Sequence, residues 1–407
     1  MDNKKNVRWL RIENLQAATA ALSRIGVDPR AIPLMAGKAF SRAVLVPGVS
    51  APAALILKQE MLSLGGDAAI HRDVVCGRRA ESDVLLLGSH KQLKRLEEKL
   101  RAQPFGLRQA GEAVGALLRA LEPSAAAAIA VACGGGVLRL GEKRTALMGI
   151  LNVTPDSFSD GGLYSQPEAA AARAREMAEE GADIIDLGAE STRPGHSPVS
   201  AAEEWARLEP VLAALSRRAM LLSVDTRKAE VADKALAAGA HILNDIDGLL
   251  GDPDMAGAAA AHGAAVVLMH NRAVPDDVIE DILHAWDAGV TVAQKAGLPA
   301  EAIIVDPGIG FGKTQEQNLE ILRRLAELKA YGLPLLLAAS RKSVIGYAAG
   351  LSVGNRMEAT MAIGVLGAAA GADILRVHDV AAHRRALDMT AAILYGLDSG
   401  NGEQNDQ

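Results

Sequence analysis

Short apolar runs alternate with longer stretches of helical periodicity from about residue 147 onwards. The apolar runs are Leu147–Leu151, Ile184–Leu187, Leu221–Val224, Ile242–Leu243, Ala265–Met269, Ile303–Val305, Leu335–Ala338 and Ile374–Val377. The helical patterns between and after them are Glu168–Glu180, Ala202–Arg217, Lys228–Ala238, Met255–Ala261, Val278–Ala296, Gln317–Leu328, Arg356–Ala370 and Ala381–Leu394. Apolar strands that alternate with helices are typical of a parallel sheet, and eight such units predict a (β/α)8 TIM barrel. The periodicity alone leaves an open doubly wound sheet as the alternative.

The first 133 residues follow a different pattern, in which helical periods are mixed with a few strand-like runs. The helical patterns cover Leu10–Ile25, Pro52–Leu64, Gln92–Arg101 and Gly111–Leu121, and the strand-like runs are Ala43–Val46 and Val84–Leu87. This part of the sequence contains no nucleotide-binding loop, no metal-ligand spacing and no nucleophile constellation. It predicts a smaller mixed α/β domain whose role the sequence does not indicate.

The glycines after Cys133 mark a change in composition, and we place a domain boundary there. We expect an accessory α/β domain over residues 1–133, the barrel over residues 134–397 and a disordered tail over residues 398–407. The runs Val137–Leu140 and Thr145–Leu147 flank Gly141–Arg144, which predicts a small hairpin that turns at these four residues.

Polar and glycine-rich segments follow nearly every predicted strand of the barrel. They are Asn152–Gly162, Glu190–Gly195, Asp225–Arg227, Asn244–Ile246, His270–Arg272, Asp306–Lys313, Ser340–Ser343 and Arg376–Asp379. Each segment by itself could be no more than a helix cap. Together they put charged groups on one rim of the barrel, where they must be desolvated side by side, and this is the rim where barrel enzymes bind their ligands.

Two kinds of side chain can be distinguished on this rim. Carboxylates and an amide, with a lysine and an apolar methionine, suit a flat ligand rich in ring N–H and amino groups. These residues are Asp225, Asn244, Asp306, Lys342 and Met269. Two arginines, a histidine and an amide suit a phosphate or diphosphate, and these are Arg193, Arg376, His378 and Asn152. The sequence therefore predicts a substrate that joins a heterocycle to a diphosphate.

Composition narrows the class of protein. Aromatic residues make up only 3% of the 407 residues, which argues against a stacking surface for nucleic acid. No apolar run is long enough for a membrane span, and the N-terminus lacks the apolar core of a signal peptide. Cys76 and Cys133 have neither metal nor redox spacing, so we expect a reduced protein of the cytoplasm that binds neither nucleic acid nor membrane.

Several segments resemble those of dihydropteroate synthases in order and spacing over roughly residues 137–395. They are Met148–Gly162, Glu190–Gly195, Ser223–Thr226, Asn244-Asp245, Asp306–Lys313, Ser340–Ser343 and Arg376–Val380. The resemblance implies condensation of 6-hydroxymethyl-7,8-dihydropterin diphosphate with para-aminobenzoate to 7,8-dihydropteroate and diphosphate. It also implies Mg²⁺ as the cofactor, small-molecule substrates, a homodimer and an enzyme of the kind that sulfonamides target. The C–O bond to diphosphate would break first, and Asp306 would stabilise the electron-poor pterin before the arylamine attacks. Loops over residues 153–166 and 190–200 would close over the site.

The resemblance also assigns residues by motif. The pterin site would comprise Asp225, Asn244, Met269, Asp306 and Lys342. The diphosphate site would comprise Asn152, Thr192, Arg193, Arg376 and His378, with Asn152 also at the metal ion. The aminobenzoate pocket would be shaped by Phe158, Pro194, Phe311 and Ser343. The catalytic residues would be Asp306, Lys342, Arg376 and His378.

Two features depart from the family pattern. His270-Asn271-Arg272 replaces a commoner methionine-containing segment, and residues 1–133 are additional. A pterin-binding methyltransferase module would share the carboxylates and amide, but it would not need the segments Asn152–Asp160 and Ser340–Ser343. A protein that only binds pterin would not need the anion ligands. Both alternatives are therefore weaker than the synthase.

Overall fold

The structure is a computed structural model, and it describes residues 8–122, 129–141, 143–153, 166–190, 199–215, 220–274 and 276–396. The chain forms two compact units, Met1–Ala125 and Ala126–Gln407. Strand β4 (Ile129–Cys133) thus belongs to the second unit, and the boundary precedes the one expected after Cys133 because β4 pairs with the strand that follows it. The expected tail over residues 398–407 lies outside the described residues.

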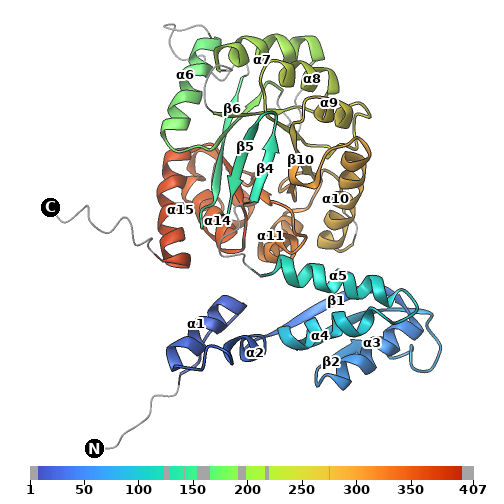
Figure 1. Cartoon of the computed structure of the whole chain (residues 1–407). Coiled ribbons are helices and arrows are strands. Elements are labelled where there is room, and N and C mark those ends of the chain that lie inside the picture. The colour runs from blue at the N-terminus through green and yellow to red at the C-terminus, as the bar shows by residue number, and fades with distance from the viewer. Residues whose placement is uncertain are drawn as a thin grey trace, which may run out of the picture. The chain divides into compact units, whose positions relative to one another are not determined.

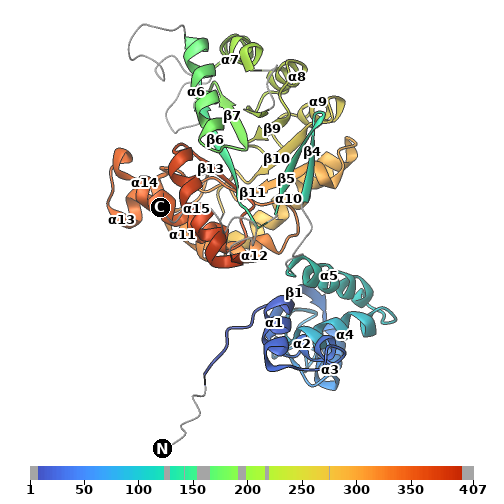
Figure 2. The same cartoon turned by 60° about the vertical axis from the view of Figure 1, so that its left-hand side comes forward.

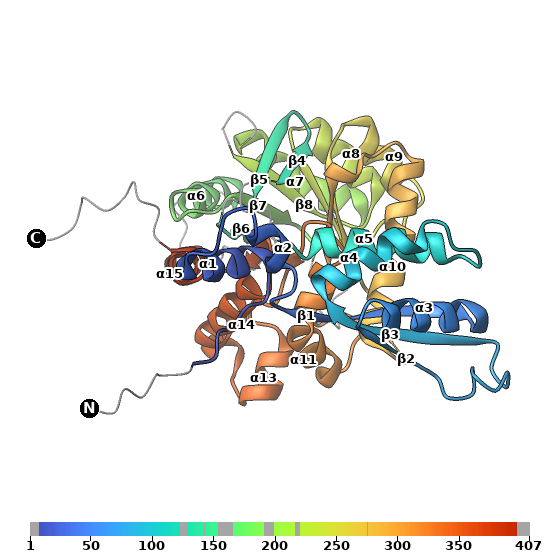
Figure 3. The ribbon, with the colours of Figure 1, turned by 60° about the horizontal axis from the view of Figure 1, so that its bottom comes forward.

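The first unit contains an antiparallel sheet in the order β1-β3-β2 with helices packed against it. Its elements are α1 (Leu15–Ile25), α2 (Ile32–Ala36), β1 (Ser41–Ser50), α3 (Ala51–Ser63), β2 (Asp67–Ile70), β3 (Glu81–Ser89), α4 (His90–Leu100) and α5 (Leu107–Ala120). Figure 3 shows β1, β3 and β2 side by side, with α3 and α4 next to them. Val44, Val84 and Leu86 alternate with exposed residues along the strands and pack on Leu57 and Leu93 of the helices. The expected mixed α/β domain is confirmed, although the pattern did not predict the short elements α2 and β2.

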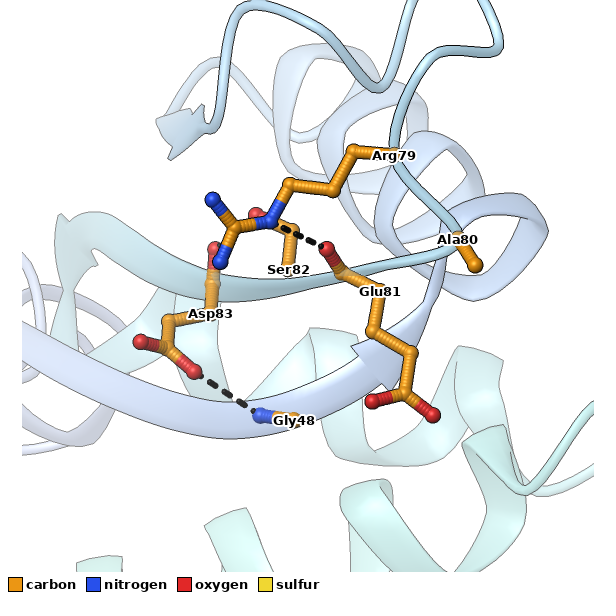
Figure 4. Close-up of a pocket in the computed structure, with 6 residues that line it drawn as sticks. All are labelled: Gly48, Arg79, Ala80, Glu81, Ser82 and Asp83. Carbon is orange, nitrogen blue, oxygen red and sulfur yellow. Dashed lines mark hydrogen bonds between the residues drawn. The ribbon is translucent and has the colours of Figure 1, made fainter.

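A surface hollow in this unit lies where the pairing of β1 with β3 shifts register between Val46 and Val49. Its lining residues are Gly48, Arg79, Ala80, Glu81, Ser82 and Asp83 (Figure 4). Asp83 Oδ1 accepts a hydrogen bond from the Gly48 amide at 2.9 Å, and Arg79 Nε donates to the Glu81 carbonyl at 3.0 Å. The hollow therefore follows from a β-bulge, which leaves ladder groups to be satisfied by side chains.

The second unit is built on eight parallel strands in the order β11-β10-β9-β8-β7-β6-β13-β12. Figures 1 and 2 show strands of this sheet, among them β6 and β10, inside the ring of helices. They are β6 (Ala146–Asn152), β7 (Ile184–Gly188), β8 (Leu221–Asp225), β9 (Ile242–Asp245), β10 (Ala265–Met269), β11 (Ile303–Asp306), β12 (Leu336–Leu337) and β13 (Ile374–Val377). A parallel bridge between Val305 and Leu335 joins the two ends of this order, so the sheet is a nearly closed barrel. The predicted TIM barrel is confirmed, and the open doubly wound sheet is wrong.

Helices surround the barrel on its outside (Figure 2). They are α6 (Gln166–Glu179), α7 (Ala201–Leu215), α8 (Ala229–Ala237), α9 (Met255–Ala261), α10 (Val278–Lys295), η2 (Ala300–Ala302), α11 (Gln315–Arg323), α12 (Leu325–Lys329), α13 (Ser343–Ala349), η3 (Val353–Asn355), α14 (Met357–Ala369) and α15 (Val380–Tyr395). The layer between strands and helices is apolar, and Leu147 and Leu151 of β6 pack there in one cluster with Ala170 and Ala174 of α6. Within the described part of the chain, no helix is long and apolar enough to cross a membrane.

A hairpin of β4 and β5 (Gly136–Leu140) closes one end of the barrel. Val131 and Leu138 pack against the residues that begin the barrel strands, such as Ile184, Ile242 and Ile374. Its turn is formed by residues 134 and 135, two glycines with positive φ of 51° and 88°. The turn predicted at Gly141–Arg144 is present, since the Arg144 amide donates to the Gly141 carbonyl at 2.7 Å and the two residues form an antiparallel bridge. The predicted hairpin between the flanking runs is wrong, because β5 pairs with β4 and not with β6. The hairpin occupies the amino end of the strands and leaves the carboxyl end for chemistry.

Candidate active site

The strands of the barrel direct alternate residues inward and outward. Outward residues pack against the helices, as Leu187 of β7 and Val224 of β8 do. The residues between them face the interior, which is apolar at the hairpin end and polar at the carboxyl end. The inward positions at the carboxyl end hold Asn152, Asp186, Gly188, Asp225, Asn244, Met269, Asp306, Ser340, Arg376 and His378. All strand-borne site residues predicted from the sequence are thus among the inward positions.

Pairing between neighbouring strands places Asn152, Gly188, Asp225 and Asn244 side by side in one row. A Cβ added at Gly188 would lie 3.7 Å from Asn152 Oδ1 and 3.8 Å from Asp225 Oδ2. The absence of a side chain at Gly188 therefore leaves space between an exposed amide and a carboxylate. The amide and the carboxylate therefore flank a position that carries no side chain.

Arg376 lies at the centre of the polar end of the barrel. Its Nε donates to Asp186 Oδ2 at 2.6 Å, and its Nη2 donates to Asp225 Oδ2 at 2.7 Å. Asn244 Nδ2 donates to the same Asp186 oxygen at 3.0 Å. Burial raises the pKa of Asp225 to about 7, while the guanidinium of Arg376 opposes this shift. Three predicted site residues thus belong to one network.

Asp186 was not predicted as a site residue. It lies in the run Ile184–Leu187, which reads as an apolar strand, and its side chain is fully buried. The available signal was a charged residue in the middle of a core strand, since a carboxylate is rarely placed there without a partner.

Asp306 and Lys342 form the other side of the polar end. Asp306 is buried, its Oδ1 accepts a hydrogen bond from the Gly308 amide at 2.7 Å, and burial raises its pKa. Lys342 donates to the Ile309 carbonyl, and its Nζ lies 4.3 Å from the centre of the Phe311 ring. Burial lowers the pKa of Lys342 to about 8, although the charge of Asp306 opposes this shift. Asp306 thus offers a buried acceptor, and Lys342 offers a donor that lies over an aromatic ring.

The loop that follows Asp306 is held by Lys313, which was not predicted as a site residue. Its Nζ donates to the carbonyls of His270, Gly308 and Phe311 at 3.1, 3.0 and 3.1 Å. Gly308 has a φ of 68°, and a Cβ there would lie 1.9 Å from the His270 carbonyl oxygen. The glycines in this segment therefore serve a tight loop that keeps Asp306 and Phe311 in place.

His378 is held by a serine from the neighbouring strand end. Ser340 Oγ lies 2.9 Å from His378 Nδ1 and accepts a hydrogen bond from the His378 amide at 3.3 Å. Met269 is buried at the inward end of β10, as an apolar wall requires. Ser343 is exposed at the start of α13 and accepts a hydrogen bond from Gln315 Nε2 at 3.2 Å.

The segment that departs from the family pattern has a structural role. His270 Nε2 lies 2.8 Å from a carboxylate oxygen of Asp281, and Arg272 binds the same carboxylate through two nitrogens at 2.8 and 2.7 Å. Burial lowers the pKa of His270 to about 4, with a further contribution from the charge of Lys313. A neutral histidine and an arginine thus connect the end of β10 to the first turn of α10.

Four predicted site residues, Phe158, Thr192, Arg193 and Pro194, lie outside the described residues, as do the greater parts of the two loops expected to close over the site. Their assignments stay predictions. In the part of the chain that the structure describes, no group of three or more His, Cys, Asp or Glu residues is placed to hold a metal ion.

Comparison with known families identifies what this barrel is similar to. The family model for pterin binding enzymes matches residues 148–378. The probable bifunctional folylpolyglutamate synthase/dihydropteroate synthase of Halobacterium salinarum is 44% identical over 412 residues, covering 96% of this chain and 48% of that protein. The dihydropteroate synthase of Clostridium beijerinckii is 47% identical over 265 residues, covering 64% of this chain and 98% of that protein. The chain spans about half the length of the bifunctional relative.

Solved structures give the same result. A dihydropteroate synthase from Clostridium difficile, solved in the presence of pteroic acid, has a TM-score of 0.60 and 48% identity, covering 62% of this chain and 97% of that one. A dihydropteroate synthase from Xanthomonas albilineans with 4-aminobenzoic acid has a TM-score of 0.63 and 41% identity, covering 66% of this chain and 98% of that one.

Proposed function

The chain belongs to the dihydropteroate synthase family of pterin binding enzymes, and we propose that it is a transferase that makes 7,8-dihydropteroate for folate biosynthesis. Its substrates would be 6-hydroxymethyl-7,8-dihydropterin diphosphate and para-aminobenzoate. The observation that carries the proposal is the polar end of the barrel, where Asp225, Asn244 and Asp306 present oxygen acceptors and Lys342 presents a donor. This set complements a heterocycle edge that bears ring N–H, amino and carbonyl groups.

The pterin would lie flat against Met269, with its pyrimidine edge toward the carboxylates. Asp306 is the best placed to stabilise positive charge on the ring, because its buried carboxylate interacts strongly in a low dielectric. Lys342 would donate to the ring carbonyl or a ring nitrogen. No side-chain nucleophile is required in this mechanism.

The diphosphate would be bound by Asn152, Arg376 and His378, with Thr192 and Arg193. Among the described residues, Arg376 uses Nε and Nη2 for the two carboxylates, which leaves Nη1 for an anion. Asn152 fits a magnesium site, since its amide oxygen is exposed beside the space left by Gly188, and Mg²⁺ takes few protein ligands in addition to phosphate oxygens and water. The chemistry that Mg²⁺ supplies when bound is neutralisation of charge on the diphosphate.

The reaction would exchange one bond for another. The C–O bond to the diphosphate breaks and its electron pair leaves with the diphosphate, which gives a cation delocalised over the pterin. The aromatic amine then forms the C–N bond and releases a proton. Asp306 would stabilise the cation, while Arg376 and His378 would stabilise the leaving anion. Rate enhancement would come from electrostatic placement and from exclusion of water.

The aminobenzoate would bind near Phe311 and Ser343, with Phe158 and Pro194 completing the pocket. Phe311 lies under the ammonium group of Lys342, so the second substrate would sit next to the pterin donor. A Yersinia pestis dihydropteroate synthase at 39% identity has been solved with a sulfonamide drug. We expect sulfonamides to compete with para-aminobenzoate in this chain too.

The enzyme would act as a homodimer in the cytoplasm. Leu366 of α14 and Met389 and Ile393 of the adjacent α15 are 70%, 62% and 70% exposed, an apolar surface typical of a subunit interface. Cys76 and Cys133 are both free thiols, which fits a reducing compartment.

The deciding experiment incubates the purified chain with the pterin diphosphate, para-aminobenzoate and Mg²⁺. We expect 7,8-dihydropteroate and diphosphate in equal amounts, and no dihydropteroate when either substrate is omitted. If the folded protein forms no product at any pH or Mg²⁺ concentration tested, the proposed activity is wrong.

A further inference from the structure

Asp186 stands at the centre of the polar network, but it contributes no atom to the predicted pterin site. Its side chain is fully buried, and one oxygen, Oδ2, accepts hydrogen bonds from both Arg376 Nε and Asn244 Nδ2. The other oxygen, Oδ1, has no hydrogen-bond partner among the described residues. A buried carboxylate is costly unless it is paired, so this arrangement requires a reason beyond filling space.

The reason lies in the side chain of Asn244. A carboxamide has a donating end and an accepting end, whereas an ionised carboxylate only accepts. Asp186 therefore binds the nitrogen of Asn244 and turns its oxygen away from Asp186. Without a charged acceptor at this place, the amide could present either end to a ligand.

We propose that Asp186 is a positioning residue that sets the hydrogen-bond polarity of the heterocycle site by fixing Asn244 as an acceptor. The inference rests on the proposed function. With Asn244 held in this way, Asp225 and Asp306 complete a site made of acceptors. Such a site selects a heterocycle edge rich in N–H and amino donors, and it rejects an analogue that carries a carbonyl in place of the amino group. An analogue that leaves such a buried polar group unpaired commonly binds many-fold more weakly than the matching ligand.

A competing explanation is that Asp186 only balances the charge of Arg376. The two explanations differ for Asp186→Asn alone: the preference for an amino-bearing ring over its oxo analogue should be lost if Asp186 fixes the Asn244 amide, and should be kept if Asp186 only balances charge. The double variant then tests whether moving the carboxylate from position 186 to position 244 restores binding. In the double variant Asp186→Asn with Asn244→Asp, the new amide can accept from Arg376 Nε and donate to the new carboxylate. That carboxylate keeps one oxygen free as an acceptor for the ligand. Net charge and acceptor polarity are both retained.

The test measures binding of 6-hydroxymethylpterin, which lacks a leaving group, to the wild type, both single variants and the double variant by calorimetry. Asn244→Asp alone places two carboxylates where the hydrogen bond of 3.0 Å now lies, and we expect affinity to fall at least about tenfold. Adding Asp186→Asn should restore affinity to within about threefold of wild type. The double variant should also keep the preference for pterin over its 2-oxo analogue, lumazine.

Turnover gives a second readout. The KM for the pterin diphosphate should follow the same order as the binding affinities, while the KM for para-aminobenzoate stays within about twofold. Ser223→Ala is the matched control, since Ser223 pairs in register with Asp186 and its buried hydroxyl has no partner among the described residues. It should bind pterin as the wild type does.

A folded double variant that binds pterin no better than Asn244→Asp, or that loses its preference over lumazine, would overturn the inference. If Asn244→Asp alone does not fold, comparison of the double variant with the wild type decides the matter by the same criteria. Failure of the proposed function looks different, because the wild-type chain itself would then neither bind pterin nor form product.

Discussion

At the scale of single residues, burial determines the chemistry of the site. Asp306 and Asp225 have raised pKa values and Lys342 a lowered one, in each case with burial as the largest cause. Groups that have lost their hydration respond strongly to a ligand that restores hydrogen bonds, which suits them to recognition and to stabilising charge.

Replacing Asp306 tests whether a buried polar group of the site recognises the ligand. Asp306→Ala removes a buried acceptor and leaves the ligand donor unpaired, and we expect affinity for 6-hydroxymethylpterin to fall at least about a hundredfold, roughly 3 kcal/mol. Calorimetry measures the affinity, and thermal unfolding checks that the variant is folded. Normal binding by Asp306→Ala would show that the pterin lies elsewhere.

The pH dependence of kcat/KM for the pterin diphosphate tests Lys342. Lysine donates only while protonated, so activity should decline as the pH rises through about 8, where the lowered pKa of Lys342 lies. On the acid side, protonation of Asp225 should reduce activity as the pH falls through about 7. In Lys342→Arg the guanidinium stays charged, and the alkaline limb should move upward even if the rate is lower. If the alkaline limb of the kcat/KM profile stays near pH 8 in Lys342→Arg, that limb reports the titration of another group.

At the scale of elements, the two ends of the barrel have different roles. The β4–β5 hairpin covers the apolar end, and the loop held by Lys313 shapes the polar end. Stability and chemistry are therefore separated along the barrel axis, as is usual for this fold.

A matched pair of substitutions in the hairpin tests the separation. Val131 is fully buried against the barrel, while Val137 on the same hairpin is 53% exposed. Val131→Asp should lower the free energy of unfolding by more than about 3 kcal/mol, because it buries an unpaired charge, and Val137→Asp should change it by less than about 0.5 kcal/mol. Denaturant unfolding measures both. The KM for the pterin diphosphate should stay near wild type in each folded variant, and a large rise would mean that the hairpin influences the site.

At the scale of the whole molecule, each of the two units has its own apolar core, and the two cores share no residue. Only the second unit contains the polar barrel end. The Halobacterium salinarum relative aligns with 96% of this chain, whereas the Clostridium beijerinckii synthase aligns with 64%. The first unit is thus not required for a protein to be a dihydropteroate synthase.

Deletion of residues 1–125 should therefore leave a folded barrel. We expect kcat/KM for both substrates to stay within about threefold of the full chain, because the candidate site residues all lie in the second unit. Steady-state kinetics and circular dichroism make the comparison. A folded but inactive barrel would assign the first unit a part in catalysis.

The sequence by itself determined the alternation of strands and helices, and with it the barrel and the strand ends that bear Asp225, Asn244, Asp306 and Arg376. These features depend on local periodicity, which a chain carries in every short window. Tertiary structure alone decided that Asp186 binds Arg376, 190 residues away, and Asn244, 58 residues away. It also decided that the β4–β5 hairpin covers the amino end of the barrel. Such contacts arise only when the sheet closes and brings distant strands together, so no short stretch of sequence contains them.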